Sequence, residues 1–176
     1  MKDMRDIRRP LIKLGKVGRD SVRLPPTAGG SRRFIEQYSP RSQRVVVKVK
    51  QSYNKSTGAW REHGRYLQRD NARAGDGFAR TEETIEIPQT LQAWQEQGDE
   101  KLHKIILSPE YSERIDLKEH ARELMVQMER DLGRPLQWVA IAHKNTENPH
   151  VHIALRGVDA EGKPLDIEEY LGKTLR

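Results

Sequence analysis

The chain of 176 residues contains no cysteine, few aromatic residues and no long apolar run. Without cysteine it can form neither a disulfide framework nor a thiolate metal site, so histidine, aspartate and glutamate must supply any metal ligands. No apolar stretch is long enough to cross a bilayer, and the basic N-terminus lacks the apolar segment of a secretory signal. We therefore expect no membrane insertion, and a reducing, cytoplasmic compartment.

Charge is abundant and unevenly distributed. Charged residues make up 33% of the chain and hydrophobic residues 35%, which leaves a small core under a highly charged surface. Residues 1–50 hold 14 lysines and arginines against 4 acids, so this segment carries +10 and the remainder −4 of the overall +6. A basic arm ahead of a mildly acidic domain favours a polyanionic partner such as nucleic acid, although a solubilising tail has the same composition.

The chain divides near residue 43. Glycines and prolines interrupt every periodic pattern in residues 1–43, which we interpret as a basic, largely flexible arm before a folded domain of residues 44–176. Periodicity in that domain predicts strands at 45–50, 103–107, 136–143 and 149–156, helices at 59–70, 88–97, 116–132 and 167–175, and either strand or coil at 82–87. This order predicts an α+β fold with a mostly antiparallel sheet and helices packed on one face.

The most informative segment is WVAIAHKNTENPHVHIALRG, residues 138–157. His150 and His152 are two residues apart, so on a strand both side chains leave the same face. His143 ends the preceding apolar strand, and an antiparallel pairing would bring it beside the other two. Three imidazoles that converge from a sheet form a facial metal site with open positions for water or substrate. A single histidine on a strand is usually structural, but three at this spacing favour a metal or catalytic site.

A metal site in a chain with a basic arm favours phosphodiester chemistry, and the chain must then supply a nucleophile. It has no cysteine and no serine in a nucleophile elbow. The remaining candidates are its five tyrosines, Tyr38, Tyr53, Tyr66, Tyr111 and Tyr170. Tyr66 is favoured because His63, Arg65 and Arg69 lie within three residues of it and would stabilise a phenolate or hold a phosphate. The competing interpretation is a core tyrosine on an amphipathic helix.

Several segments, taken in order, resemble the relaxase/mobilisation nuclease domain of the HUH endonuclease superfamily, on the branch of mobilisation relaxases that includes the T-DNA border nuclease. They are VVVKVK at 45–50, HGRYLQRD at 63–70, HKIILSPE at 103–110, DLGRPLQWVA at 131–140 and the histidine-rich segment 143–157. The pattern His-x6-His-x-His, with Asn-Pro before its second histidine, is the most specific. The resemblance extends from about residue 44 to the C-terminus.

This resemblance implies a five-stranded antiparallel sheet flanked by helices, with a metal on its central strands. It implies metal-dependent, site- and strand-specific nicking and rejoining of single-stranded DNA at a plasmid or conjugative transfer origin. The nucleophile falls on Tyr66, which would form a 5′-phosphotyrosine intermediate, and the metal ligands fall on His143, His150 and His152. Mg²⁺ or Mn²⁺ would neutralise the scissile phosphate, although imidazole ligands suit Zn, Co or Ni equally well.

One position departs from the family pattern. Many members carry an acid two residues after the first histidine, where this chain has Asn145; Glu147, two residues further on, is the alternative acid or orienting group. Candidates for contacts with DNA phosphates are the basic residues near these motifs, Arg65, Arg69, Lys144 and Arg156. We leave His103 outside the site and interpret His120 as a surface residue.

Three functions remain open. The first is a relaxase, expected to be the N-terminal part of a longer protein and to act with relaxosome accessory proteins and a coupling protein. The second is a non-cleaving DNA-binding protein that retains the HUH fold. The third is a replication initiator of the same superfamily, in which the tyrosine usually follows the histidines; here only Tyr170 does, and Glu168 and Glu169 precede it. Loss of cleavage in Tyr66→Phe would favour the first function, and loss in Tyr170→Phe alone the third.

Overall fold

The computed structural model describes residues 45–69 and 76–167. The predicted arm at 1–43, including Tyr38, lies outside the described residues. The same holds for Tyr170 and for all but the first residue of the helix predicted at 167–175. None of the described helices is long and apolar enough to span a membrane.

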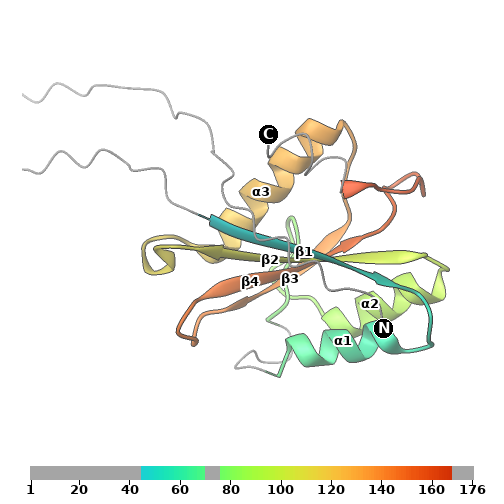
Figure 1. Cartoon of the computed structure of the whole chain (residues 1–176), viewed down its shortest axis with the longest axis horizontal. Helices are drawn as coiled ribbons and strands as arrows, with labels where there is room; N and C mark the ends of the chain where they lie inside the picture. The colour runs from blue at the N-terminus through green and yellow to red at the C-terminus, as the bar shows by residue number, and fades with distance from the viewer. Residues whose placement is uncertain (1–44, 70–75, 168–176) are drawn as a thin grey trace, which may run out of the picture.

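Four strands and three α-helices make up the described part of the chain (Figure 1). The strands are β1 (Val45–Tyr53), β2 (Lys101–Pro109), β3 (Trp138–His143) and β4 (His150–Arg156). The helices are α1 (Ala59–Leu67), α2 (Ile87–Glu96) and α3 (Leu117–Leu132), with a short 3-10 helix at Ser112–Arg114. The strands form one open sheet in the order β1-β2-β4-β3, and every neighbouring pair is antiparallel, which confirms the α+β class.

The fifth strand implied by the resemblance is not found among the described residues. At the free edge of β3, Phe78 pairs with Ala140 through two backbone hydrogen bonds of 2.8 Å. The neighbouring Gly77 pairs with Ile85 in a separate local bridge, so this segment contributes a single bridge to β3 and no strand. Residues 82–87, which fitted strand or coil, contribute only Ile85 to that bridge before α2 begins.

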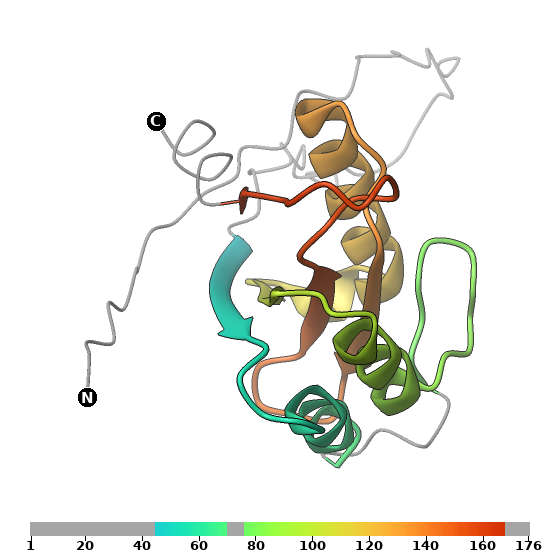
Figure 2. The same cartoon turned by 90° about the vertical axis from the view of Figure 1, so that its right-hand side faces the viewer.

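Helices cover both faces of the sheet, so the prediction of one covered face was wrong. α3 lies on one face, while α1 and α2 lie side by side on the other (Figures 1 and 2). The reason is visible in β3, where the run Trp138–Ile141 is buried throughout, as in strands covered on both sides. Trp138 and Ala140 join the core under α3, and Val139 and Ile141 join a second core with α1 and α2.

The helix α3 forms as its sequence predicts. The Asp116 carboxylate caps its N-terminus by accepting from the backbone N–H groups of Lys118 at 2.8 Å and Glu119 at 3.4 Å. Gly133 ends the helix in the left-handed conformation, with φ at 65°. The buried residues are those that the spacing predicted, Leu117, Ala121, Leu124, Met125 and Met128.

The helix α1 is shorter than predicted, and Tyr66 does not lie on its buried face. It ends at Leu67, and its buried residues are Trp60, Gly64 and Leu67, whereas Tyr66 is 56% exposed. Gly64 allows the backbones of α1 and α2 to approach closely, because a Cβ at that position would lie 2.7 Å from the Cα of Pro88. The interpretation of Tyr66 as a core residue is therefore wrong.

Two histidines outside the predicted metal site lie on the α3 side of the molecule. His103 is fully buried on the α3 face of β2, and its Nε2 donates to the Leu165 carbonyl at 3.2 Å. Its Nδ1 has no partner among the described residues, and burial lowers the pKa of His103 to about 4. His120 on α3 is half-buried rather than on the surface as predicted, and burial lowers its pKa as well.

Replacing His103 with glutamine should weaken the pH dependence of stability. The imidazole has a pKa of about 4 in the fold against 6.5 for an unperturbed histidine, so between these values the unfolded chain binds more protons. Wild-type stability therefore falls as the pH drops from about 6.5 to about 4. Glutamine keeps a donor for the Leu165 carbonyl without titrating, so we expect the loss to shrink by about 2–3 kcal/mol. Urea unfolding across this pH range measures it; equal losses in both proteins would contradict the prediction.

Candidate functional site

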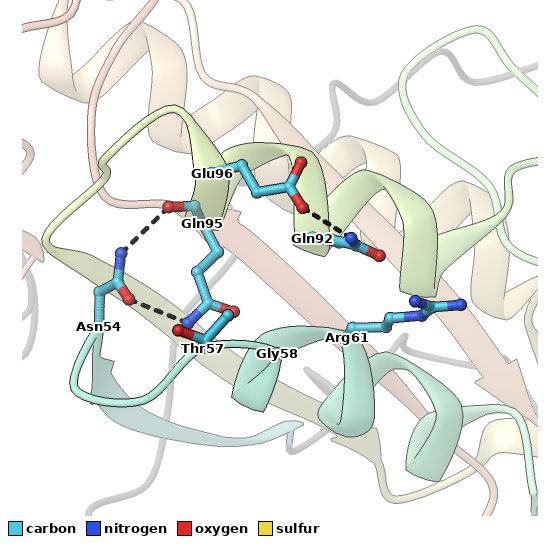
Figure 3. Close-up of a pocket in the computed structure, with 7 residues that line it drawn as sticks. All are labelled: Asn54, Thr57, Gly58, Arg61, Gln92, Gln95 and Glu96. Atoms are coloured by element: carbon cyan, nitrogen blue, oxygen red, sulfur yellow. Dashed lines mark hydrogen bonds between the residues drawn. The ribbon is translucent and has the colours of Figure 1, made fainter.

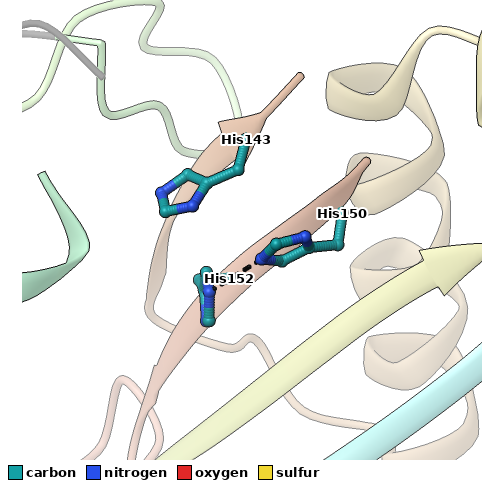
Figure 4. Close-up of side chains that lie close together, drawn as sticks. All are labelled: His143, His150 and His152. Carbon is teal, nitrogen blue, oxygen red and sulfur yellow. Dashed lines mark hydrogen bonds between the residues drawn. The ribbon is translucent and has the colours of Figure 1, made fainter. Parts of the chain in front are cut away.

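The hairpin of β3 and β4 brings the three predicted histidines together. His143 is the cross-strand partner of His150, and His152 follows two residues along β4, so all three leave the same face of the sheet. The ring centroids lie 4.8–5.2 Å apart, and one ring nitrogen from each histidine lies within 4.8 Å of the others. The rings project from the face opposite α3 (Figure 4). We refer to these three residues as the histidine cluster.

Two backbone carbonyls orient the rings of the cluster. His143 Nε2 donates to the carbonyl of Leu67 at 2.8 Å, and His150 Nδ1 donates to the carbonyl of Asn148 at 2.8 Å. Because a carbonyl only accepts, each of these nitrogens carries a proton, and the other ring nitrogen is left as the atom that could bind a metal. His150 Nε2 lies 3.1 Å from His152 Nε2. Such outer hydrogen bonds are typical of histidines that bind metals.

The surroundings of His152 favour a neutral imidazole. Burial, together with the neighbouring His150, His143 and His63, lowers the pKa of His152 to about 4. Metal binding requires the unprotonated ring, which is therefore available at neutral pH without a proton having to be displaced. The donor set, its orientation by carbonyls and its charge state together fit a divalent cation.

Tyr66 lies where the end of α1 meets the cluster. The carbonyl that accepts from His143 belongs to Leu67, the next residue in the chain, so this bond ties the end of α1 to β3. The Tyr66 ring is 56% exposed and stacks against the His63 ring, with centroids 6.5 Å apart. Tyr53 is exposed to a similar extent, at 55%. Tyr66 is therefore distinguished as the candidate nucleophile by its place next to the cluster and not by its exposure.

His63 is a further member of this neighbourhood, predicted from the sequence only as a cation beside Tyr66. It is half-buried on α1, one turn before Tyr66, and close enough to His152 to lower the pKa of that residue. Burial and the Lys104 ammonium lower the pKa of His63 itself to about 4, so it is neutral at pH 7 and not one of the cations expected around Tyr66. The i,i+3 spacing from Tyr66 was the available signal, since residues three apart lie on one side of a helix.

The two candidates for the missing acid lie in the turn between β3 and β4. Asn145 and Glu147 are both exposed there, close in sequence to His143 and His150. Within residues 45–69 and 76–167, no carboxylate joins the three histidines in the cluster.

Three of the four basic candidates lie near the cluster. Arg65 and Arg69 are exposed on either side of Tyr66, and Lys144 is exposed directly after His143. Arg65 also pairs with Glu62 at 2.5 Å on the surface of α1. Because this ion pair is exposed, it holds the guanidinium weakly, and a phosphate could replace the carboxylate.

Arg156 is engaged within the fold. Its Nε and Nη2 donate to the two carboxylate oxygens of Asp99 at 2.6 and 2.9 Å, and its terminal nitrogens also donate to Gln137 at 2.7 Å and Gln97 at 2.6 Å. Asp99 is only 6% exposed, and Arg156 lies at the opposite end of β4 from His150. A guanidinium with these partners supports the fold, and we leave it out of the proposed DNA interface.

Replacing Arg156 with methionine should destabilise the fold by about 3 kcal/mol, because it leaves the Asp99 carboxylate buried and unpaired. Urea unfolding measures the change. Arg130→Met is the matched control, since Arg130 is exposed on α3 and its loss should cost less than about 0.5 kcal/mol. If Arg156→Met left stability unchanged and weakened DNA binding, Arg156 would be assigned to the DNA interface instead.

A pocket of about 360 Å³ lies between the start of α1 and the end of α2, away from the cluster (Figure 3). Its lining residues are Asn54, Thr57, Gly58, Arg61, Gln92, Gln95 and Glu96. Gln95 is already saturated: its Nε2 donates to Asn54 Oδ1 at 2.9 Å and to the Ser56 carbonyl at 2.7 Å, and its Oε1 accepts from the Trp60 N–H at 3.2 Å. These bonds fix the turn into α1, so the polar groups of Gln95 stabilise the fold.

An antiparallel sheet that presents three histidines beside an exposed helical tyrosine is the arrangement expected of an HUH-type nuclease domain. The family model of the MobA/VirD2-like relaxase nuclease domain matches residues 53–176, and the chain belongs to this family. Membership implies binding of single-stranded DNA and DNA nicking in mobilisation. Relaxases of this family are metal-dependent, and the histidine cluster could hold a metal ion. Comparison with curated proteins and with solved structures gives no significant match.

Proposed function

We propose that this chain nicks and rejoins single-stranded DNA at the transfer origin of a plasmid or conjugative element, with site and strand specificity, through a 5′-phosphotyrosine intermediate. The observation that carries the proposal is the 2.8 Å hydrogen bond from His143 to the Leu67 carbonyl. It joins the histidine cluster to the residue that follows Tyr66. A phosphate bound at the cluster would therefore lie within reach of Tyr66.

The metal would be held by His143, His150 and His152. Bound there, a divalent cation would neutralise the charge that develops on the scissile phosphate. Mg²⁺ or Mn²⁺ is our first expectation for phosphodiester chemistry, and the imidazole donors equally suit Zn, Co or Ni. Arg65, Arg69 and Lys144 would contact flanking phosphates, because all three are exposed around the cluster.

Tyr66 would act as the nucleophile. Its phenolic oxygen forms a bond to phosphorus, the bond from phosphorus to the 3′ oxygen breaks, and the 5′ phosphate becomes esterified to the tyrosine. Attack of the free 3′ hydroxyl on this ester restores the DNA strand and the phenol. Glu147 is the proposed group that orients a histidine or takes the phenolic proton, since Asn145 can form hydrogen bonds but cannot act as a base.

The proposal is tested with single-stranded oligonucleotides from the transfer origin of the element that encodes the protein. They are incubated with the protein and Mn²⁺ or Mg²⁺ and analysed on denaturing gels and by mass spectrometry. We expect a DNA–protein adduct on the peptide that carries Tyr66, with none from the complementary strand and none after chelation of the metal. Relaxosome accessory proteins and a coupling protein remain the expected partners on the natural, duplex substrate.

A non-cleaving DNA-binding protein is the second candidate. It is favoured by one observation: no carboxylate of the described residues joins the cluster, and Asn145 stands where many relatives carry an acid. Binding of the oligonucleotide without cleavage or adduct, in every metal tried, would establish this second function and exclude the first.

A further inference from the structure

Three lysines lie on the same face of the sheet as the histidine cluster. The register aligns His152 of β4 with Ile106 of β2, and Ile106 with Lys48 of β1. Two residues along the strands, Lys104 of β2 is the direct partner of Lys50 of β1. Since partners across an antiparallel pair share a face, as do residues two apart, all these side chains leave the histidine face. We refer to Lys48, Lys50 and Lys104 as the lysine patch.

The lysine patch belongs to the part of this face that the helices leave open. Lys48 and Lys50 are exposed, Lys104 is half-buried, and the neighbouring Val46 is 48% exposed although it lies on a strand. On the same face, β3 and β4 contribute buried residues to the core under α1 and α2. The face therefore has a covered part and an open part, and the open part begins next to His152.

The lysine patch concentrates positive charge on this face of the sheet. Among the described residues, no carboxylate forms an ion pair with Lys48, Lys50 or Lys104. Lys50 and Lys104 are direct cross-strand partners, an arrangement in which like charges destabilise a sheet. Burial and the Lys50 ammonium lower the pKa of Lys104, as expected for such repulsion. A bound polyanion would remove this cost.

The lysine patch also lies close to the residues of α1 and β4 that are proposed to take part in the reaction. The Lys104 ammonium acts on the His63 imidazole, which stacks on Tyr66. Neighbouring strands lie about 4.8 Å apart, so the backbone at Lys48 is roughly 10 Å from that at His152. Ile106 lies between Lys48 and His152, and the exposed Val46 lies two residues from Lys48 along β1, so both provide apolar surface on which bases could pack. Lys48 and Lys50 precede residues 53–176, which the family model matches.

We propose that Lys48, Lys50 and Lys104 bind the backbone of single-stranded DNA next to the scissile phosphate and so determine which phosphate enters the histidine cluster. This inference rests on the proposed function. Phosphates on one side of the nick lie along β1 and β2, and the strand then passes to the cluster at the end of α1. The patch acts by charge and position, and the sequence of the DNA is read elsewhere.

The test compares two triple variants that remove the same charge. The patch variant is Lys48→Gln, Lys50→Gln and Lys104→Gln, and the control is Lys55→Gln, Arg130→Gln and Lys163→Gln, at exposed positions outside the patch. Fluorescence anisotropy, without metal and over a range of salt concentrations, measures affinity for the transfer-origin oligonucleotide. We expect the patch variant to bind about tenfold more weakly at low salt, and the slope of log K against log salt to shrink by about 2. The control should change both values much less.

Stability must be measured beside affinity. Because the variant removes the repulsion between Lys50 and Lys104, we expect it to melt no lower than wild type. Lys48→Gln alone, at an exposed edge position, provides a second variant in which the salt slope should shrink by about 0.7. Equal loss of affinity in the patch and control variants would overturn the proposed role of the lysine patch. Unchanged affinity of the patch variant for an oligonucleotide that wild type nicks would overturn it as well. A wild-type protein that neither binds nor nicks DNA would overturn the proposed function itself.

Discussion

Replacing Tyr66 with phenylalanine should abolish the covalent DNA adduct and lower nicking by at least about a thousandfold. Phenylalanine retains the ring that stacks on His63 and leaves the bond between His143 and the Leu67 carbonyl in place, so α1 should stay docked on the cluster. Only the attacking oxygen is lost. Binding of the oligonucleotide should therefore change by no more than about twofold, a change that anisotropy resolves.

Tyr53→Phe and Tyr111→Phe are the matched controls. Both tyrosines are exposed, at 55% and 45%, but neither lies at the end of α1. We expect full nicking and a full yield of adduct from each. Tyr170→Phe completes the set, because loss of cleavage in that variant alone would favour a replication initiator in which the later tyrosine attacks. Persistent adduct formation in Tyr66→Phe would remove Tyr66 from the reaction.

Replacing His150 and His152 together with alanine should abolish metal binding and, with it, nicking. Two of the three converging imidazoles are lost, and one remaining ligand cannot hold a divalent cation at low concentration. The third, His143, keeps its hydrogen bond to the Leu67 carbonyl, so the attachment of α1 to β3 survives. We expect metal affinity, measured by calorimetry with Mn²⁺ and with Zn²⁺, to fall by at least about 100-fold.

The DNA affinity of this double variant shows whether the metal site and the surface that binds DNA are distinct. If the lysine patch and the arginines around Tyr66 hold the DNA, affinity measured without metal should change little when the two histidines are replaced. His103→Gln is the control, since His103 lies on the opposite face of the sheet. Retained metal-dependent nicking in the double variant would exclude the cluster from the reaction. Lost DNA binding without metal would assign the histidines a direct contact with the strand.

Local patterns predicted much of the fold. The two-residue spacing of His150 and His152 and the turn formers before them were enough to predict the hairpin that carries the cluster. In α3, the cap at Asp116, the stop at Gly133 and the apolar stripe each act within a few residues, so the helix was confirmed almost to its ends. Such features depend on neighbours in the chain, which a sequence displays directly.

The features that local patterns did not predict have a common physical origin in long-range packing. The all-buried run in β3 was compatible with helices on both faces, but only the packed structure shows that α1 and α2 lie opposite α3. The side of α1 on which Tyr66 lies was decided by the close contact of Gly64 with Pro88. Arg156 is engaged by Asp99, and this partner is distant in sequence.

The sequence alone was sufficient to predict the α+β class, the antiparallel hairpin, the grouping of the three histidines and the resemblance to relaxases. These follow from periodicity, turn chemistry and ordered motifs, all of which are local. The folded structure was needed to show that Tyr66 is exposed beside the cluster, that His63 lies close to both, and that the lysines of β1 and β2 share the histidine face. Those relations depend on strand register and helix docking, which are fixed by contacts between residues far apart in the chain.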